Sequence, residues 1–210
     1  MRKAGLNLRW HSAATYLSVL TIIVSLTVAY LVNGSFVSTV RMVDLRSYGG
    51  TTFEDIRNFE LWRIAFAQML HSKMPHMLFN AACLYLLGRL IEDASGGFTM
   101  LAVWLVAGGA ATVLSPILVD APWNVGTGAS QAVFAFAGFA AVFAAARRIS
   151  RTWSIGLIAL AVIPGVVLDL LFAGYPKPGH VAGLIFGALF GFAVLTVPLR
   201  PSPPSGNAMH

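Results

Sequence analysis

Residues 12–33 form an uncharged, mostly apolar run, and no other feature of the chain constrains its fold so strongly. An α-helix rises about 1.5 Å per residue, so a helix of this length crosses the roughly 30 Å hydrocarbon core of a bilayer. A secretory signal peptide would have a shorter apolar region and a small-residue cleavage site. The run therefore predicts a transmembrane helix.

The composition extends this prediction to the whole chain. Of 210 residues, 57% are apolar and only 10% are charged, which is too few charges for the polar shell of a soluble domain. The net charge of +6 comes from basic residues at segment ends, with no basic patch, so no nucleic-acid partner is expected. The single cysteine, Cys83, permits no intrachain disulfide.

Five further apolar segments predict helices over residues 75–93, 98–119, 130–146, 153–173 and 179–199. The long connection 34–73 is expected to hold short helices in the outer membrane interface, and residues 174–178 a tight loop. Residues 1–11 are expected to be a cytoplasmic segment and residues 200–210 a disordered cytoplasmic tail. The predicted fold class is all-α: a polytopic membrane bundle of six helices over residues 12–199, with a long first outer loop.

The distribution of charge predicts the orientation of this bundle in the lipid bilayer. With the N-terminus inside, the inner segments carry eight basic and two acidic residues, whereas the outer segments carry six of each. Basic residues are retained on the cytoplasmic side of membranes. Both termini are therefore expected in the cytoplasm, in a bacterial-type plasma membrane.

That orientation brings polar residues to one depth. Helices two, four and six all begin at the outer face, and their first turns hold His76 and Asn80, Ser130, and His180 respectively. His76 and Asn80 are four residues apart and share a helix face. His180 shares its face with Gly183, in a ridge of small residues that permits close approach to a neighbouring helix. Ser130 and His180 are expected within hydrogen-bond reach.

These residue types point to acyl transfer. A serine hydroxyl becomes nucleophilic when a neighbouring base accepts its proton, and His180 can act as that base. His76, Asn80 and the Ser130 backbone N–H can donate hydrogen bonds to the oxyanion. Helices two, four and six offer no third, acidic member, and Asp169 falls on helix five, so a Ser–His dyad is predicted.

Each residue also has a structural interpretation. Ser130 follows glycines at a loop–helix junction, where serine commonly caps a helix. A histidine or an asparagine in a membrane helix can simply join two helices by hydrogen bonding. His71 is expected to be an interface residue or to brace a loop, and Glu92 to pair with Arg89 or cap a loop.

These segments resemble the rhomboid family of intramembrane serine proteases over nearly the whole chain. The matching motifs occur in the family's order: Trp62-Arg63 in the first loop, His76-x-x-x-Asn80 with Gly88 and Glu92, Gly128-Ala129-Ser130, and Gly179-His180-x-x-Gly183 with Gly187. The resemblance implies a Ser130 nucleophile, a His180 base and an oxyanion hole of His76, Asn80 and the Ser130 N–H. It also implies a site reached by water from outside, with Phe134 packed against the base and Trp62-Arg63 as scaffold.

The resemblance further implies that single-span membrane proteins enter from the bilayer near helices two and five, with loop 174–178 as a cap. One departure is Gln131, where the family normally has glycine, since its side chain can either crowd the substrate or add a donor. Gln131 favours an alternative function, a catalytically inactive rhomboid-like protein that binds transmembrane segments. A small transporter ranks lower because no inverted repeat is visible. A metalloprotease lacks its H-E-x-x-H motif, and no metal or organic cofactor is expected.

Overall fold

The computed structural model describes residues 11–121 and 124–196, and this part of the chain is almost entirely helical. Thr51 and Gly126 form an isolated antiparallel bridge. The helices are α1 (Ala13–Asn33), α2 (Met42–Ser47), α3 (Phe53–Arg57), α4 (Trp62–Ala67), α5 (Met74–Ser95), α6 (Gly97–Ala102), the π-helix η1 (Val103–Gly108), α7 (Gly109–Leu114), α8 (Ser130–Ala145), α9 (Arg151–Phe172) and α10 (Pro178–Thr196). The predicted N-terminal segment, apart from His11, and the predicted tail 200–210 lie outside the described residues.

Five helical segments are long and apolar enough to cross a membrane: α1, α5, the continuous α6–η1–α7 segment, α9 and α10. The predicted all-α, polytopic fold class is confirmed. The predicted fourth span corresponds to α8, which has 16 residues and is shorter than the other five. The long connection between α1 and α5 holds three short helices, α2 to α4, as predicted.

The predicted end of the third span was wrong. Helix α7 ends at Leu114, five residues before the predicted boundary at residue 119. Pro116 has no N–H to donate to the Thr112 carbonyl, and the Ser115 hydroxyl donates to that carbonyl instead, over 2.9 Å. The proline and the serine together end the helix, so the loop before Ser130 is longer than predicted.

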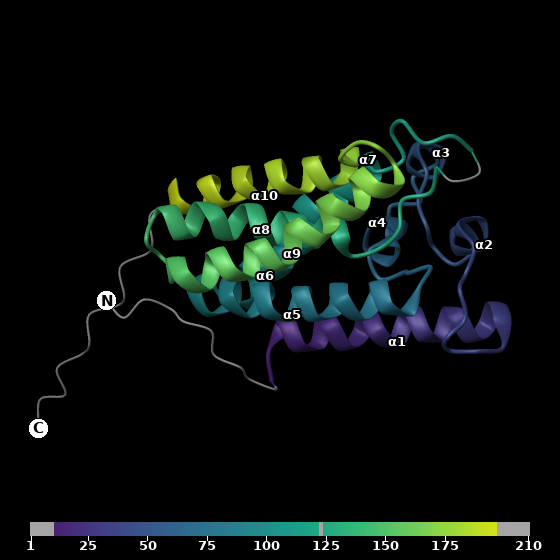
Figure 1. Ribbon diagram of the computed structural model, residues 1–210, viewed down its shortest axis with the longest axis horizontal. Helices are drawn as coiled ribbons and strands as arrows, with labels where there is room; N and C mark the ends of the chain where they lie inside the picture. The colour runs from purple at the N-terminus through teal and green to yellow at the C-terminus, as the bar shows by residue number, and fades with distance from the viewer. Residues whose placement is uncertain (1–10, 122–123, 197–210) are drawn as a thin grey trace, which may run out of the picture.

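Figure 1 shows the arrangement of the helices. Helices α5, α8 and α10 run in one direction, and α1, α6–η1–α7 and α9 run in the opposite one. The short helices α2, α3 and α4 gather at the end of the bundle where α8 and α10 begin (Figure 1). That end therefore collects the first turns of the three parallel helices and the loops between them.

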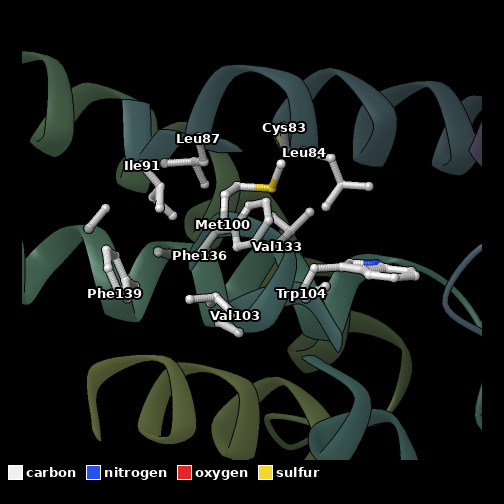
Figure 2. Close-up of a cluster of buried hydrophobic side chains, with 14 of the residues drawn as sticks. Cys83, Leu84, Leu87, Ile91, Met100, Val103, Trp104, Val133, Phe136 and Phe139 are labelled. Atoms are coloured by element: carbon white, nitrogen blue, oxygen red, sulfur yellow. The ribbon is translucent and has the colours of Figure 1, made fainter. Parts of the chain in front are cut away.

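Helix α8 lies in the centre of the bundle, and all but two of its residues are buried. Phe136 and Phe139 pack with Leu87 and Ile91 of α5 and with Val103 of η1 in one cluster of buried side chains (Figure 2). A helix surrounded by protein on every side has no polar face, which explains why its sequence contains no charge. Helix α9, by contrast, exposes many of its large apolar side chains, as expected of a helix that faces lipid.

The closest helix pair is α8 and α10. A Cβ atom at Gly183 would overlap the Gln131 carbonyl oxygen, and a Cβ atom at Gly187 would overlap the Ala135 carbonyl oxygen. A Cβ atom at Gly138 of α8 would likewise overlap the backbone of α10. The predicted glycine ridge of the last helix therefore packs directly against α8, and this contact brings the first turns of the two helices together.

The opposite end of the bundle is held by charged residues of α5. The Glu92 carboxylate accepts the backbone N–H groups of Ala13 and Ala14 at 3.0 and 3.1 Å, which caps the start of α1. Arg89, which is buried, pairs with Glu92 at 3.2 Å and also with Asp93. Glu92 thus both pairs with Arg89 and caps a helix, and it lies at the opposite end of α5 from His76 and Asn80.

Candidate active site

The loop that leads into α8 is held from three sides. Gly126 exchanges two backbone hydrogen bonds with Thr51, at 2.7 and 3.0 Å. Gly128 has a φ of +92°, which favours glycine, and its N–H donates to the Ala67 carbonyl at 2.9 Å. The Ala129 N–H donates to His71 Nε2 at 3.2 Å. These contacts fix the position at which Ser130 begins the helix.

Ser130 does not cap α8. The N-cap residue is Ala129, and Ser130 is the first helical residue. Its hydroxyl oxygen lies 2.9 Å from Nε2 of His180, the third residue of α10. The structure therefore brings together the two predicted site residues that matter most for nucleophilic chemistry, although they are 50 residues apart.

A carboxylate completes this arrangement. Asp169 Oδ2 lies 2.6 Å from His180 Nδ1, on the other side of the ring from Ser130. The three residues are shielded from solvent, with exposed fractions of 8% for Ser130, 7% for His180 and 1% for Asp169. A serine, a histidine and an aspartate hydrogen-bonded in this order form the arrangement known as the catalytic triad of serine hydrolases.

The prediction that no carboxylate reaches His180 was therefore wrong. Asp169 is about one turn before the end of α9, and His180 is in the first turn of α10. The tight connection 174–178 makes these two helices antiparallel neighbours, so the end of one meets the start of the next. That short loop was the signal in the sequence from which the Asp169–His180 contact could have been inferred.

Phe134 packs flat on the histidine, as the family resemblance implied. Its ring centroid lies 4.4 Å from that of His180, with 9° between the ring planes. Phe134 is one turn after Ser130 on α8, so the same helix holds the hydroxyl and one face of the imidazole. The ring of His180 is thereby oriented by Phe134 and by hydrogen-bond partners at both nitrogens.

His71 connects the remaining parts of the site. Its Nε2 accepts the Ala129 N–H and lies 3.1 Å from Asn80 Nδ2, while its Nδ1 lies 3.0 Å from Ser25 Oγ. A ring nitrogen that accepts an amide N–H carries a lone pair, so these partners assign the proton to Nδ1. Burial lowers the pKa of His71 to about 3, which keeps the ring neutral. The prediction that His71 braces a loop is confirmed.

The other two predicted site residues do not contact Ser130 directly. Within residues 11–121 and 124–196, no hydrogen bond joins Ser130 to His76 or to Asn80. Asn80 is buried and contacts His71, which in turn accepts the N–H of Ala129 in the loop before Ser130. His76 is exposed at the start of α5, with its ring edge-on to His71 at a centroid distance of 5.4 Å.

Gln131 is accommodated beside the serine. The side chain is buried, with Oε1 3.4 Å from Ser130 Oγ, so its amide presents an acceptor to the hydroxyl. A Cβ atom at Gly179 would lie 3.1 Å from Gln131 Cγ and 2.6 Å from Ser115 Cβ. Glycine at position 179 therefore leaves room for the Gln131 side chain, because a Cβ atom there would crowd it and Ser115.

Trp62 and Arg63 support this end of the bundle from the first loop. The Arg63 guanidinium donates to the carbonyl oxygens of Arg46 and Gly50 at 2.7 and 3.0 Å and lies 4.8 Å from the Trp62 ring centroid. Gly50 immediately precedes Thr51, which exchanges backbone hydrogen bonds with Gly126 in the loop before Ser130. The pair thus acts as scaffold: it supports the segment that holds the loop before Ser130. In the part of the chain that the structure describes, no cluster of three or more His, Cys, Asp or Glu side chains is arranged to hold a metal ion.

The long apolar helices define a polytopic α-helical membrane protein. Residues 58–197, more than half of the chain, match the rhomboid domain, and the chain belongs to the rhomboid family. It is similar to the rhomboid protease AarA of Providencia stuartii, with 26% identity over 75% of this chain and 64% of the relative.

Two further relatives match over smaller parts of their own length. The rhomboid protease GluP of Bacillus subtilis is 27% identical over 80% of this chain and 32% of the relative. The rhomboid-like protease 5 of Toxoplasma gondii is 28% identical over 71% of this chain and 18% of the relative. The chain thus spans less than two thirds of the length of each of these three relatives.

Proposed function

We propose that this protein is an intramembrane serine endopeptidase, in which Ser130 is the nucleophile and His180 the general base. The observation that carries the proposal is the buried 2.9 Å contact between Ser130 Oγ and His180 Nε2, formed between two apolar helices of the bundle. An activated serine needs such a base within hydrogen-bond distance. The similarity to AarA and GluP, both named rhomboid proteases, supports the same assignment.

The geometry supports a two-step hydrolysis. His180 Nε2 takes the Ser130 proton while Oγ attacks the carbonyl carbon of the scissile peptide bond. The tetrahedral intermediate collapses, the C–N bond breaks, and His180 gives the proton to the leaving amine. Water then attacks the acyl-enzyme ester with His180 again as base, which releases the carboxylic acid and restores the serine.

The oxyanion hole is proposed to consist of the Ser130 backbone N–H with His76 and Asn80. Ser130 is the first residue of α8, where backbone N–H groups have no partner within the helix. His76 and Asn80 share one face of α5, one turn apart, at the same end of the bundle. Each donor that reaches the oxyanion is expected to contribute about 10²-fold or more to the rate.

The substrates are proposed to be single-span membrane proteins that enter from the bilayer between α5 and α9. Loop 174–178 would cover the site, and it is attached to the preceding loop by a 3.1 Å hydrogen bond from the Tyr175 hydroxyl to the Leu118 carbonyl. In this proposal α8 also crosses the membrane, as the fourth of six spans, with protein rather than lipid around it. Both termini would lie in the cytoplasm of a bacterial-type cell, with the site opening toward the outside.

The proposal is tested by replacing the nucleophile in purified protein reconstituted with a single-span substrate. We expect Ser130→Ala to reduce the cleavage rate by about 10³-fold or more, because the hydroxyl forms the acyl intermediate. Ser154→Ala is a matched control, since Ser154 is a buried serine on α9 whose hydroxyl donates to the carbonyl of Ser150, the residue that caps the start of the same helix. Cleavage by Ser130→Ala at the rate of the Ser154→Ala variant would rule out the mechanism.

A second candidate function is a binding protein for transmembrane segments, without catalysis. The observation in its favour is the Gln131 amide oxygen, 3.4 Å from the Ser130 hydroxyl, because it offers the proton a second acceptor. That distance is long for an O–H···O bond, so it competes weakly with the 2.9 Å contact to His180. A fluorophosphonate probe reacts covalently with an activated serine, and we expect Gln131→Gly to change the rate at which it labels Ser130 by less than about threefold. Labelling that arises only in Gln131→Gly would favour the binding protein instead.

A further inference from the structure

Asp169 is a buried carboxylate in direct contact with the proposed general base His180. It is 1% exposed, near the end of an apolar helix, and its Oδ2 atom lies 2.6 Å from the ring nitrogen of His180 that faces away from Ser130. Burying a carboxylate is costly unless charged or N–H groups compensate it. This buried carboxylate lies against His180, the histidine that contacts the proposed nucleophile Ser130.

Two contacts from Lys177 hold the carboxylate in place. The Lys177 backbone N–H donates to Oδ2 at 2.9 Å, so this oxygen accepts from the loop and from the histidine together. The Lys177 ammonium lies 3.7 Å from Oδ1 and is half-exposed. The rotamer of Asp169 is therefore fixed from a side other than the imidazole, as a residue that orients a base requires.

We propose that Asp169 is a positioning residue that holds His180 with its proton on Nδ1 and stabilises the imidazolium formed when Ser130 is deprotonated. This inference rests on the proposed function and replaces its Ser–His dyad by a Ser130–His180–Asp169 triad. A carboxylate can only accept, so Nδ1 must donate, which leaves the Nε2 lone pair directed at the serine. Phe134, stacked on the ring, leaves in-plane rotation as the main freedom, and Asp169 restricts it.

A second role for Asp169, as an anchor of loop 174–178 alone, makes different predictions. Asparagine keeps an oxygen that can accept both the Lys177 N–H and the imidazole N–H, so Asp169→Asn preserves the loop contact and removes the charge. An anchor alone would therefore leave the kinetics of Asp169→Asn unchanged. A positioning carboxylate would not, because the imidazolium loses its counter-charge.

The first test is the rate profile of Asp169→Asn against pH, with a reconstituted transmembrane substrate. We expect kcat to fall by about 10²-fold with KM unchanged within about twofold, because the loss occurs in the transition state. The dependence of kcat/KM on pH should also differ from that of the parent, because the imidazolium formed during catalysis has lost its negative partner. The titratable and charged groups around His180 are Asp169 of α9, Lys177 of the α9–α10 connection and His76 of α5. Asp169→Asn therefore removes the negative one among them.

Asp44→Asn is the matched control, since Asp44 is a carboxylate of the first outer loop paired with Arg41 at 2.7 Å. It should keep the parental rate and pH profile. An Asp169→Asn protein with the parental kcat and the parental pH profile would overturn the inference.

The second test reads the parent chain itself, and a variant serves only to assign one signal. Nitrogen-15 NMR of histidine-labelled protein, with His180 assigned by His180→Ala, reports which ring nitrogen carries the proton. We expect a protonated Nδ1 and an unprotonated Nε2, with a downfield Nδ1 proton. A proton on Nε2 would overturn the inference. Because this readout requires no turnover, it separates the two proposals: undiminished cleavage by Ser130→Ala refutes the protease mechanism, whatever tautomer His180 has.

Discussion

At the scale of single residues, the site depends on a histidine that takes no part in the proposed chemistry. His71 accepts hydrogen bonds from Asn80 and Ala129 through one nitrogen, so it links a proposed oxyanion donor to the residue that precedes Ser130. Only the neutral ring has a lone pair for these donors. A protonated His71 would lose both contacts, and the loop would lose one of its three supports.

This role makes a prediction about pH and stability. Burial lowers the pKa of His71 from its usual value of 6.5 to about 3, whereas the unfolded chain binds this proton near pH 6.5. The unfolded state therefore binds more protons between these values, and the free energy of unfolding falls as the pH is lowered through this range. Between pH 7 and pH 4.5, His71 should account for a loss on the order of 2–3 kcal/mol.

Thermal unfolding in detergent at these two pH values measures the effect. We expect His71→Gln to be less stable than the parent at pH 7 and to lose less stability on acidification. His11→Gln, at an exposed histidine near the start of α1, should retain the parental pH dependence. Parallel pH dependences for the parent and His71→Gln would show that His71 is not the group responsible.

At the scale of elements, the contact between α8 and α10 sets the distance between Ser130 and His180. Their backbones approach closely because glycines of α10 face backbone carbonyls of α8. We expect Gly187→Ala to destabilise the protein by about 1–3 kcal/mol, since its Cβ would overlap the Ala135 carbonyl. The helices would have to separate, so serine reactivity should fall as well.

Gly156→Ala is the matched control for this prediction. Gly156 lies on α9, and a Cβ atom there would meet no neighbouring side chain or helix within 4 Å, so alanine is tolerated and should stabilise the helix by up to about 1 kcal/mol. Unfolding temperatures of the two variants in the same detergent are compared. Equal stability of Gly187→Ala and Gly156→Ala would contradict the close packing of α8 against α10.

The elements also show what the sequence can predict. Apolar length predicted the helices, because a bilayer requires about 20 apolar residues per span, and the glycine spacing of α10 predicted its packing face. The π-helix η1 and the pairing of Thr51 with Gly126 were not predicted, since both depend on tertiary contacts rather than on local pattern. The contact of Asp169 with His180 was not predicted for a related reason: it depends on how two helices meet across the tight loop 174–178, which apolar length alone does not show.

At the scale of the whole molecule, the charge distribution predicts the orientation in the membrane. Single cysteines introduced at Tyr175 and Arg147, in a Cys83→Ser background, test it with a membrane-impermeant maleimide. Both side chains are exposed. Arg147 follows the end of α8, whereas Tyr175 lies between the end of α9 and the start of α10, and these helix ends lie at opposite ends of the bundle (Figure 1). We expect labelling at residue 175 in intact cells, and at residue 147 only after the cells are opened. The reverse pattern would place the proposed site on the cytoplasmic side.

The activated serine itself is the central claim, and a fluorophosphonate probe tests it most directly on the purified protein in detergent. The parent should be labelled, and Ser130→Ala and His180→Ala should not be, because the probe reacts only with a serine whose proton has an acceptor. Circular dichroism confirms that each variant remains helical. Labelling of the parent that is lost in both variants is the predicted result. A folded parent that is not labelled, or labelling that survives in Ser130→Ala, would contradict the account.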